Sequence, residues 1–204
     1  MLFSIVIFDE PDTAALRDEW RTRHLDYLKE FDDQTLFAGP FTTDDESADL
    51  GSMRLLDFPD RAAAEKHVDD EPYVHAGIQQ RWHINRWEAS LPYTWRDCPR
   101  TEGNLQAYFH GLDVADGVER RASVQEEQYA YLDEHAQSIM VRGPLLTDDG
   151  ASQIGSVMLF DSPDMAANRA LLDNMPFTKA GVYKDITFHR WRFGRVFDRF
   201  KVPV

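Results

Sequence analysis

The order of apolar and polar residues along the chain predicts one series of strands and helices in the first ninety residues. Residues 2–8 form a continuous aliphatic and aromatic run, which predicts a buried strand. The polar segment after it, with Pro11 and Asp12 as start signals, predicts a helix over residues 13–31. Two more strands are expected at residues 36–41, stopped by Gly39-Pro40 and a polar loop, and at residues 52–56.

A second helix is expected after Pro59, because proline is tolerated in the first turn of a helix. Alternation over residues 82–87 then predicts a fourth strand. The resulting order, βαββαβ, is that of the ferredoxin-like unit. Its helices cover one face of the sheet, so the other face needs a partner.

The chain supplies that partner itself, because the pattern recurs at an offset of 104 residues. The segment FAGPFTTDD, which contains Gly39, aligns with VRGPLLTDD, which contains Gly143. The same offset aligns Gly51-Ser52 with Gly155-Ser156, DFPD with DSPD, and Arg86-Trp87 with Arg190-Trp191. The predicted fold is therefore α+β, with two ferredoxin-like repeats packed sheet to sheet as a fused dimeric α/β barrel.

The domain limits follow from where the alternation of apolar and polar residues is lost. We expect a first repeat at residues 1–89, a linker at 90–104, a second repeat at 105–194 and a C-terminal extension at 195–204. The linker contains two prolines and a glycine, and its Tyr93 and Trp95 suggest that it packs against the protein. The extension is expected to pack on a neighbouring surface.

Composition narrows the classes of function. A chain of 204 residues, 43% of them hydrophobic, can bury a substantial core. Its single cysteine, Cys98, excludes an intrachain disulfide and favours a reducing cytoplasm. The apolar N-terminal run is too short for a membrane span and lacks a basic leader. A net charge of −14 disfavours binding to nucleic acid or an anionic membrane.

His24 is the first candidate for chemistry. Leu16, Trp20, His24 and Leu28 recur at steps of four, which places the imidazole in the apolar stripe of its helix. One interpretation is a hydrogen-bonded core histidine. The other is a general base, oriented by Asp9 or Glu71 and working beside Arg17 or Arg21. Burial would lower the pKa of His24 and a close carboxylate would raise it, and the sequence does not decide between them.

Alignment of the two repeats favours the interpretation of His24 as a catalytic base. Asp9 and Arg17 are matched by Asp113 and Arg121. Four groups that can move a proton or hold an anion are replaced in the second repeat: Arg21 by Gln125, His24 by Gln128, Glu71 by Met175 and Tyr73 by Phe177. We therefore expect one working site in the first repeat and a degenerate one in the second. The alternative is neutral sequence drift at four packing or surface positions that have no catalytic role.

Other candidates carry weaker signals. Ser52 follows Gly51 at a strand entry without a nucleophile elbow, so it is expected to serve the backbone or bind a substrate anion. His67, His75 and His83 recur at every eighth residue, a spacing that brings no metal-binding face together. No phosphate loop or dinucleotide motif occurs, so we expect neither metal nor cofactor.

The segments HLDYL, FAGPFTTDD, GSMRLLDF and EPYVHAG, in this order, resemble the YciI-like (YCII-related) proteins. The resemblance covers nearly all of the first repeat and, more weakly, the second. It implies a dimeric α/β barrel and a site built around a histidine and an acid. Relatives include an enzyme that removes chloride from a chlorinated hydroxyquinol, but a fold-level analogy does not fix a substrate.

The favoured hypothesis is a cofactor-independent lyase or isomerase, with a dehydrochlorinase as one form, acting on a small aromatic or oxygenated substrate. His24 would move the proton, Glu71 or Asp9 would orient it, and Arg17 or Arg21 would neutralise an enolate or carboxylate. Ser52 and Tyr73 are the other expected substrate contacts. The alternatives are a non-catalytic small-molecule-binding or accessory protein and a structural subunit. A homodimer of the fused chain is left open.

Overall fold

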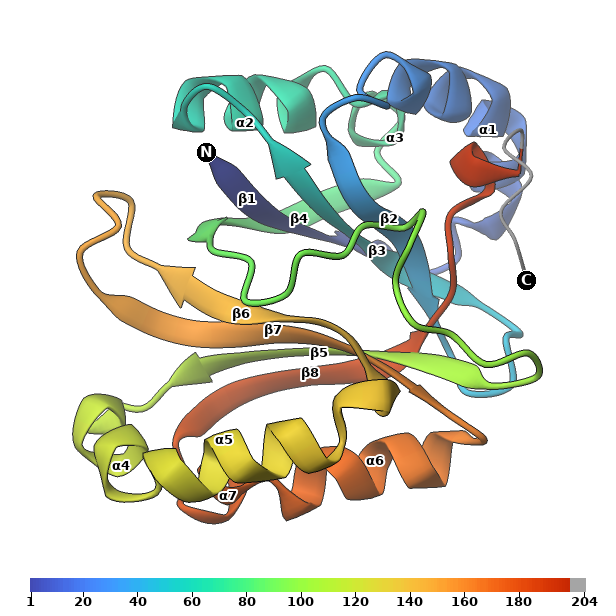
Figure 1. Ribbon diagram of the computed structural model, residues 1–204. Helices are drawn as coiled ribbons and strands as arrows, with labels where there is room; N and C mark the ends of the chain where they lie inside the picture. The colour runs from blue at the N-terminus through green and yellow to red at the C-terminus, as the bar shows by residue number, and fades with distance from the viewer. Residues whose placement is uncertain (199–204) are drawn as a thin grey trace.

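Two four-stranded antiparallel sheets lie face to face in the computed structural model, which describes residues 1–198, and helices cover their outer faces (Figure 1). The first half contains β1 (Leu2–Asp9), α1 (Ala14–Lys29), β2 (Thr35–Thr42), β3 (Asp49–Asp57), α2 (Arg61–Asp69), α3 (Pro72–His75) and β4 (Gln79–Trp87). The second half contains β5 (Leu105–Asp113), α4 (Gly117–Ser123), α5 (Gln125–Glu134), η1 (Ala136–Ser138), β6 (Ile139–Leu146), β7 (Gln153–Ser162), α6 (Met165–Asn174), α7 (Pro176–Lys179) and β8 (Tyr183–Trp191).

The two sheets join at both edges into one closed barrel with the strand order β1-β3-β2-β8-β5-β7-β6-β4. At one seam Phe41 of β2 pairs with Trp191 of β8, and at the other Trp87 of β4 pairs with Leu145 of β6. Closure pairs the strand edges that each half would otherwise expose. The predicted α+β fold, two ferredoxin-like repeats forming a fused dimeric barrel, is confirmed.

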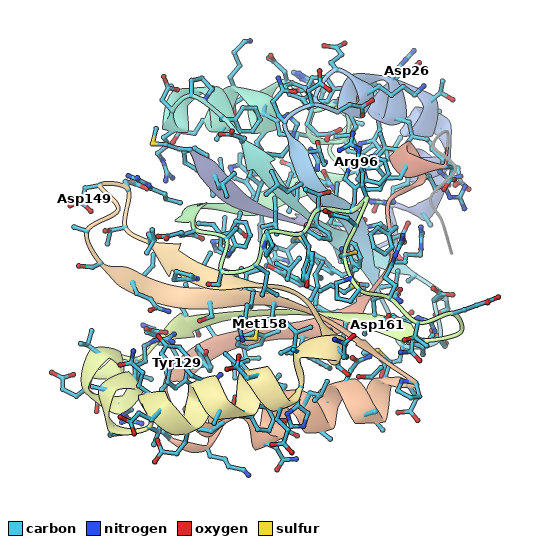
Figure 2. All side chains as sticks on the ribbon, viewed as in Figure 1. Asp26, Arg96, Tyr129, Asp149, Met158 and Asp161 are labelled. Atoms are coloured by element: carbon cyan, nitrogen blue, oxygen red, sulfur yellow. The ribbon has the colours of Figure 1, made fainter. Side chains whose placement is uncertain are left out.

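Side chains from both halves fill the space between the sheets (Figure 2). The largest apolar cluster contains Phe37, Phe41 and Trp87 from the first half together with Tyr108 and Trp191 from the second, all at most 4% exposed. Two smaller clusters lie under the helices, one in each half. Because burial of apolar area is the main favourable term in folding, the shared cluster ties the two halves together.

The expectation that Gly39-Pro40 stops the second strand is wrong, because β2 continues through both residues to Thr42. A Cβ on Gly39 would lie 2.0 Å from the carbonyl oxygen of Arg192. The segment after β8 runs alongside β2 here, with Arg192 N donating to Pro40 O (3.3 Å) and Gly194 N to Ala38 O (2.9 Å). The glycine therefore permits a close backbone approach.

The linker packs onto the protein, as expected. Trp95 is 3% exposed, and its backbone N donates to Leu36 O at 2.8 Å. Its ring stacks on Phe197 of the short 3-10 helix η2 (Arg195–Phe197), with ring centroids 4.4 Å apart. Within the predicted extension, Val196 and Phe197 are buried, while residues 199–204 lie outside the described part of the chain.

The first helix of each half differs in form. In the first half α1 is continuous and slightly shorter than expected, whereas the second half divides the equivalent segment into α4 and α5 at Val124. No helix in the described part of the chain is long and apolar enough to cross a membrane.

Candidate functional site

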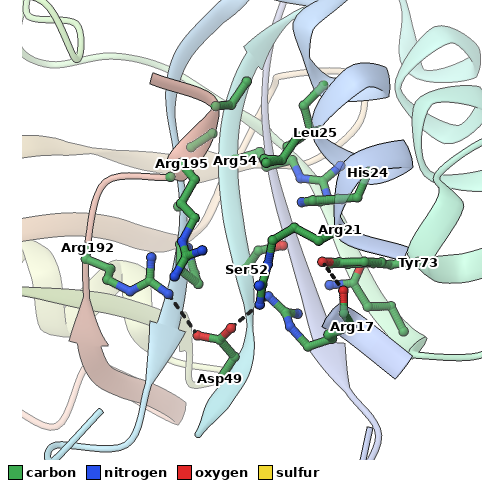
Figure 3. Close-up of a pocket in the computed structure, with 17 residues that line it drawn as sticks. Arg17, Arg21, His24, Leu25, Asp49, Ser52, Arg54, Tyr73, Arg192 and Arg195 are labelled. Carbon is green, nitrogen blue, oxygen red and sulfur yellow. Dashed lines mark hydrogen bonds and ion pairs between the residues drawn. The ribbon is translucent and has the colours of Figure 1, made fainter. Parts of the chain in front are cut away.

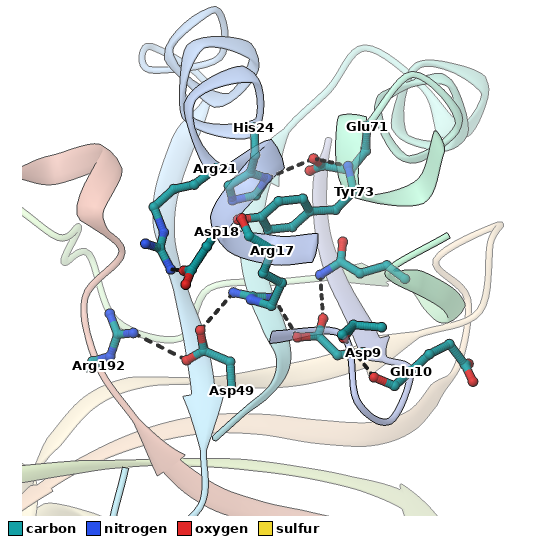
Figure 4. A network of polar contacts seen from close by, with 12 residues as sticks. Asp9, Glu10, Arg17, Asp18, Arg21, His24, Asp49, Glu71, Tyr73 and Arg192 are labelled. Atoms are coloured by element: carbon teal, nitrogen blue, oxygen red, sulfur yellow. Dashed lines mark hydrogen bonds and ion pairs between the residues drawn. The ribbon is translucent and has the colours of Figure 1, made fainter. Parts of the chain in front are cut away.

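His24 and Glu71 form a direct contact in the first half. His24 lies on α1, and its Nδ1 is 2.8 Å from Glu71 Oε1 (Figure 4). Glu71 is fully buried and caps the N-terminus of α3, where it accepts a hydrogen bond from Tyr73 N at 3.2 Å. Of the two acids considered from the sequence, Glu71 is therefore the one that contacts the imidazole.

The second oxygen of Glu71 binds Arg54, a buried residue of β3 that the sequence reasoning missed. Arg54 Nη1 also lies 3.0 Å from Nε2 of His67, a buried residue of α2. The repeat alignment contained the signal: Arg54 is matched by Met158 and His67 by Leu171. The ionisable groups lost from the second repeat thus number more than the four that we compared.

Burial and charge set the protonation of this cluster. Burial by itself raises the pKa of Glu71, but Arg54 and His24 together hold it below its usual value, so Glu71 is a carboxylate. Burial lowers the pKa of His24 and outweighs the opposing effect of Glu71. Burial and the Arg54 charge lower the pKa of His67 to about 3. Near neutral pH, His24 is therefore neutral, with its proton on Nδ1 facing Glu71 and Nε2 available as a base.

Tyr73 fixes the plane of the imidazole. Its ring stacks on His24 with centroids 4.0 Å apart and planes 3° from parallel. Its hydroxyl donates to the backbone oxygen of Arg17 at 3.1 Å, and the Arg17 guanidinium lies over the same ring. Because that hydroxyl already has an acceptor, the geometry favours a positioning role for Tyr73 over the substrate contact expected from the sequence.

Asp9 contacts other partners than His24. Its carboxylate binds Arg17 at 2.5 Å and Gln79 at 3.0 Å. Burial raises the pKa of Asp9, against the opposing effects of Arg17 and Gln79. Asp49 on β3 then bridges Arg17 (3.0 Å) and Arg192 (3.2 Å). Asp9 therefore acts on Arg17, and the chain of contacts continues to the segment after β8 (Figure 4).

A cavity of about 60 Å³ lies beside this network, between α1, β2, β3 and the segment after β8 (Figure 3). Since one water needs on the order of 10–15 Å³ measured in this way, the space suits a small ligand. Five of the sequence-predicted residues line it, and Glu71 and Asp9 lie behind them. The lining includes Arg17, Arg21, His24, Ser52 and Tyr73, together with Arg54, Asp49, Gln79, Arg192 and Arg195, which the sequence reasoning did not select.

The equivalent place in the second half has a different chemistry. Gln128 Oε1 accepts from Phe177 N at 3.0 Å, taking the capping contact that Glu71 makes in the first half. Gln128 Nε2 lies 3.7 Å from the sulfur of Met175. The adjoining groove is wide, about 720 Å³, and contains neither an imidazole nor a carboxylate among its lining residues. Within residues 1–198, no group of three or more His, Cys, Asp or Glu side chains could hold a metal ion.

Comparison with known proteins gives a family match in sequence. The family described as YCII-related domain matches residues 1–88 and 105–192. No curated protein sequence matches the chain. In structure, the chain is similar to 5-chloro-2-hydroxyhydroquinone dehydrochlorinase from Burkholderia phenoliruptrix AC1100 in complex with 2,5-dihydroxybenzoquinone. That likeness has 25% identity and a TM-score of 0.40, and it covers 43% of this chain and 94% of the other.

Two structures with lower sequence identity match nearly the whole chain. A heme-binding protein from Thermus thermophilus is 15% identical with a TM-score of 0.59, covering 98% of this chain and 94% of the other. A mutant chlorite dismutase from Candidatus Nitrospira defluvii is 7% identical with a TM-score of 0.63, covering 97% and 92%. At this identity the likeness shows the shared barrel fold and says nothing of chemistry.

Proposed function

Because this chain belongs to the YCII-related family, we propose that it is a cofactor-independent lyase or isomerase in which the His24–Glu71 pair of the first repeat transfers a proton on a small oxygenated substrate. Elimination of chloride, the reaction named for the Burkholderia enzyme, is one reaction of this class. The observation that carries the proposal is the contact of Glu71 with His24 Nδ1 beside a cavity lined by arginines. The compartment proposed with it is the cytoplasm.

The chain's own groups suit general acid-base catalysis. A neutral imidazole with Nδ1 held by a carboxylate presents Nε2 as a base in a fixed tautomer. Arg54 keeps Glu71 ionised, so the carboxylate stabilises the imidazolium that forms when Nε2 takes a proton. Tyr73 holds the ring plane, and the arginines face the substrate oxygen on which negative charge develops.

The proposed step balances without a redox partner. His24 Nε2 takes a proton from an acidic C–H or O–H of the substrate, and the freed electron pair forms an enolate. In a lyase the enolate then expels its leaving group as an anion, and the imidazolium releases its proton to water. In an isomerase it is reprotonated at another carbon by the same imidazolium. A small substrate fits the cavity directly, whereas an aromatic body requires side chains such as Arg195 to move aside.

The test replaces His24 with the residue that the second repeat carries. We expect His24→Gln to lower turnover about 10²-fold or more, the usual contribution of a general base. The readouts are C–H exchange in D₂O followed by NMR, over a set of small keto acids and hydroxylated aromatics, and chloride release from 5-chloro-2-hydroxyhydroquinone. His75→Gln is the matched control, because His75 is exposed on α3 and does not line the cavity.

The pH profile gives an independent readout. Because burial lowers the pKa of His24, the wild-type rate should stay constant down to below pH 6.5 and fall only where Nε2 becomes protonated. Equal turnover by wild type and His24→Gln would contradict the proposal. Ligand binding without exchange or chloride release in the wild type would favour the alternative, a non-catalytic small-molecule-binding protein.

A further inference from the structure

One wall of the first-repeat cavity comes from the far end of the chain. The segment Arg192–Val196 follows β8 of the second half, crosses to the first half and lies against α1 (Figure 1). Its backbone is fixed to β2 by the hydrogen bonds to Pro40 and Ala38 described above. The cavity beside His24 is therefore incomplete without residues that lie outside the first repeat.

Two buried polar atoms of residues that line this cavity have no protein partner within residues 1–198. They are Nε of Arg17 and Oγ of Ser52, in side chains that are at most 9% exposed as whole residues. Leaving a buried donor without an acceptor is costly, so a partner is expected in the working protein. A third such atom, Gln79 Oε1, is an acceptor and suits a hydroxyl or enol of the same ligand.

The second repeat gives the two matched groups partners within the protein. There, Nε of Arg121 donates to Asp113 at 2.8 Å, and its Nη2 donates to Ser156 Oγ at 3.1 Å. Ser156 also accepts from the Tyr183 hydroxyl at 3.2 Å. Tyr183 is the counterpart of Gln79, so exchanging one residue for the other leaves the first-repeat serine open. Among the described residues, the unpartnered Arg17 Nε and Ser52 Oγ are thus particular to the repeat that holds His24.

Positive charge is also concentrated in the first-repeat cavity. Arg195 lines it and has no ion pair within the described residues, and Arg21 pairs only with Asp18, whose side chain is 67% exposed. Such an exposed pair is weak and easily exchanged for another anion. Figure 3 shows the guanidinium groups of Arg21 and Arg195 reaching toward the same space from opposite sides.

The matched segment after β4, which lies beside the second-repeat groove, does not carry these two arginines. The offset of 104 residues aligns Arg192 with Glu88 and Arg195 with Leu91. The backbone contacts are nevertheless the same, since Glu88 N donates to Pro144 O and Ser90 N to Arg142 O. The two segments therefore share a structural role, and only the C-terminal one brings cations to its cavity.

We propose that the cavity beside His24 binds a small carboxylate, held by Arg195 and Arg21 at its entrance and by Arg17 Nε and Ser52 Oγ within, so that Arg195 determines specificity from the other half of the chain. The guanidinium fork matches a carboxylate, whose oxygens accept from several donors at once. The inference rests on the proposed function in using the same cavity, and it names the substrate class as small carboxylic acids.

Binding of malonate, with malonamide as its neutral isostere, tests the proposal by calorimetry on the full chain. We expect malonate to bind and malonamide to bind at least about tenfold more weakly, because hydrogen bonds to a charged acceptor are stronger than those to a neutral amide. Arg195→Gln should weaken malonate binding by a similar factor. This variant should fold normally, since Arg195 is exposed and unpaired within residues 1–198.

Two further variants separate this inference from the proposed function. Arg142→Gln makes the same change at the second-repeat groove and should leave malonate binding unchanged. His24→Gln should keep malonate binding while losing proton exchange. Equal binding of malonate and malonamide, full malonate affinity in Arg195→Gln, or equally tight binding of inorganic phosphate would overturn the inference. None of these results would alter a His24-dependent exchange reaction, which tests the proposed function alone.

Discussion

At the scale of single residues, the cluster of His24, Glu71 and Arg54 contains the Glu71 carboxylate and the Arg54 guanidinium, both of them buried. Glu71 is 0% exposed and Arg54 is 1% exposed. Buried charges are costly unless they are paired and hydrogen-bonded, and Glu71 uses both of its oxygens in this way. The second repeat shows that the fold itself does not require them, since Gln128, Met158 and Met175 fill the matched positions.

This comparison predicts a large cost for removing Glu71 alone. Glu71→Met should lower the free energy of unfolding by about 3–5 kcal/mol, because it leaves the Arg54 charge buried without a counterion. The triple variant His24→Gln, Arg54→Met, Glu71→Met should recover most of that loss, because it removes both buried charges and places the second repeat's residues at these three positions. Urea unfolding of the two variants measures both effects. A triple variant no more stable than Glu71→Met would show that the two repeats are not equivalent here.

At the scale of elements, the segment after each repeat's last strand is fixed by one glycine of the opposite half. Gly39 meets the carbonyl oxygen of Arg192, and a Cβ on Gly143 would lie 1.9 Å from that of Glu88. A neighbouring backbone atom cannot move aside as a flexible side chain can. The glycine of the repeated Gly-Pro pair therefore positions the segment that closes each cavity.

Alanine substitutions at these two glycines should have similar effects on protein stability but different effects on malonate binding. Gly39→Ala and Gly143→Ala should each destabilise the protein by about 1–3 kcal/mol through overpacking. Only Gly39→Ala should also weaken malonate binding, because it displaces the segment that carries Arg192 and Arg195. Thermal unfolding and calorimetry measure the two effects. A Gly143→Ala variant with equally weakened malonate binding would contradict this assignment.

At the scale of the whole molecule, the two repeats share one barrel and one central core. Both seams of the barrel join strands of different halves, and the largest apolar cluster includes residues of both sheets. Either half alone would expose that surface to water, at a cost of roughly 25 cal/mol per Å² of apolar area. The first-repeat cavity and the second-repeat groove therefore differ in chemistry although both belong to one cooperative structure.

This arrangement predicts a single unfolding transition. Tryptophan fluorescence, to which Trp87 and Trp191 at opposite seams contribute, should change at the same urea concentration as far-UV circular dichroism. Trp191→Phe serves as a control that leaves the first half to dominate the fluorescence signal, and it should again give coincident curves. Two separated transitions would show that the repeats unfold independently.

The sequence by itself determined the repeat, the fold and the residues that differ between the halves, because periodicity and punctuation are local properties of the chain. It brought His24, Glu71, Arg17 and Arg21 forward as candidates, but left Asp9 and Glu71 as equal partners for the imidazole. Only the tertiary structure shows that Glu71 is the acid in contact with His24. It alone brings Arg54 on β3, Arg195 after β8 and His24 on α1 to one cavity. Their separation along the chain is large, and contacts of this kind depend on how strands pair and close the barrel, which no local pattern encodes.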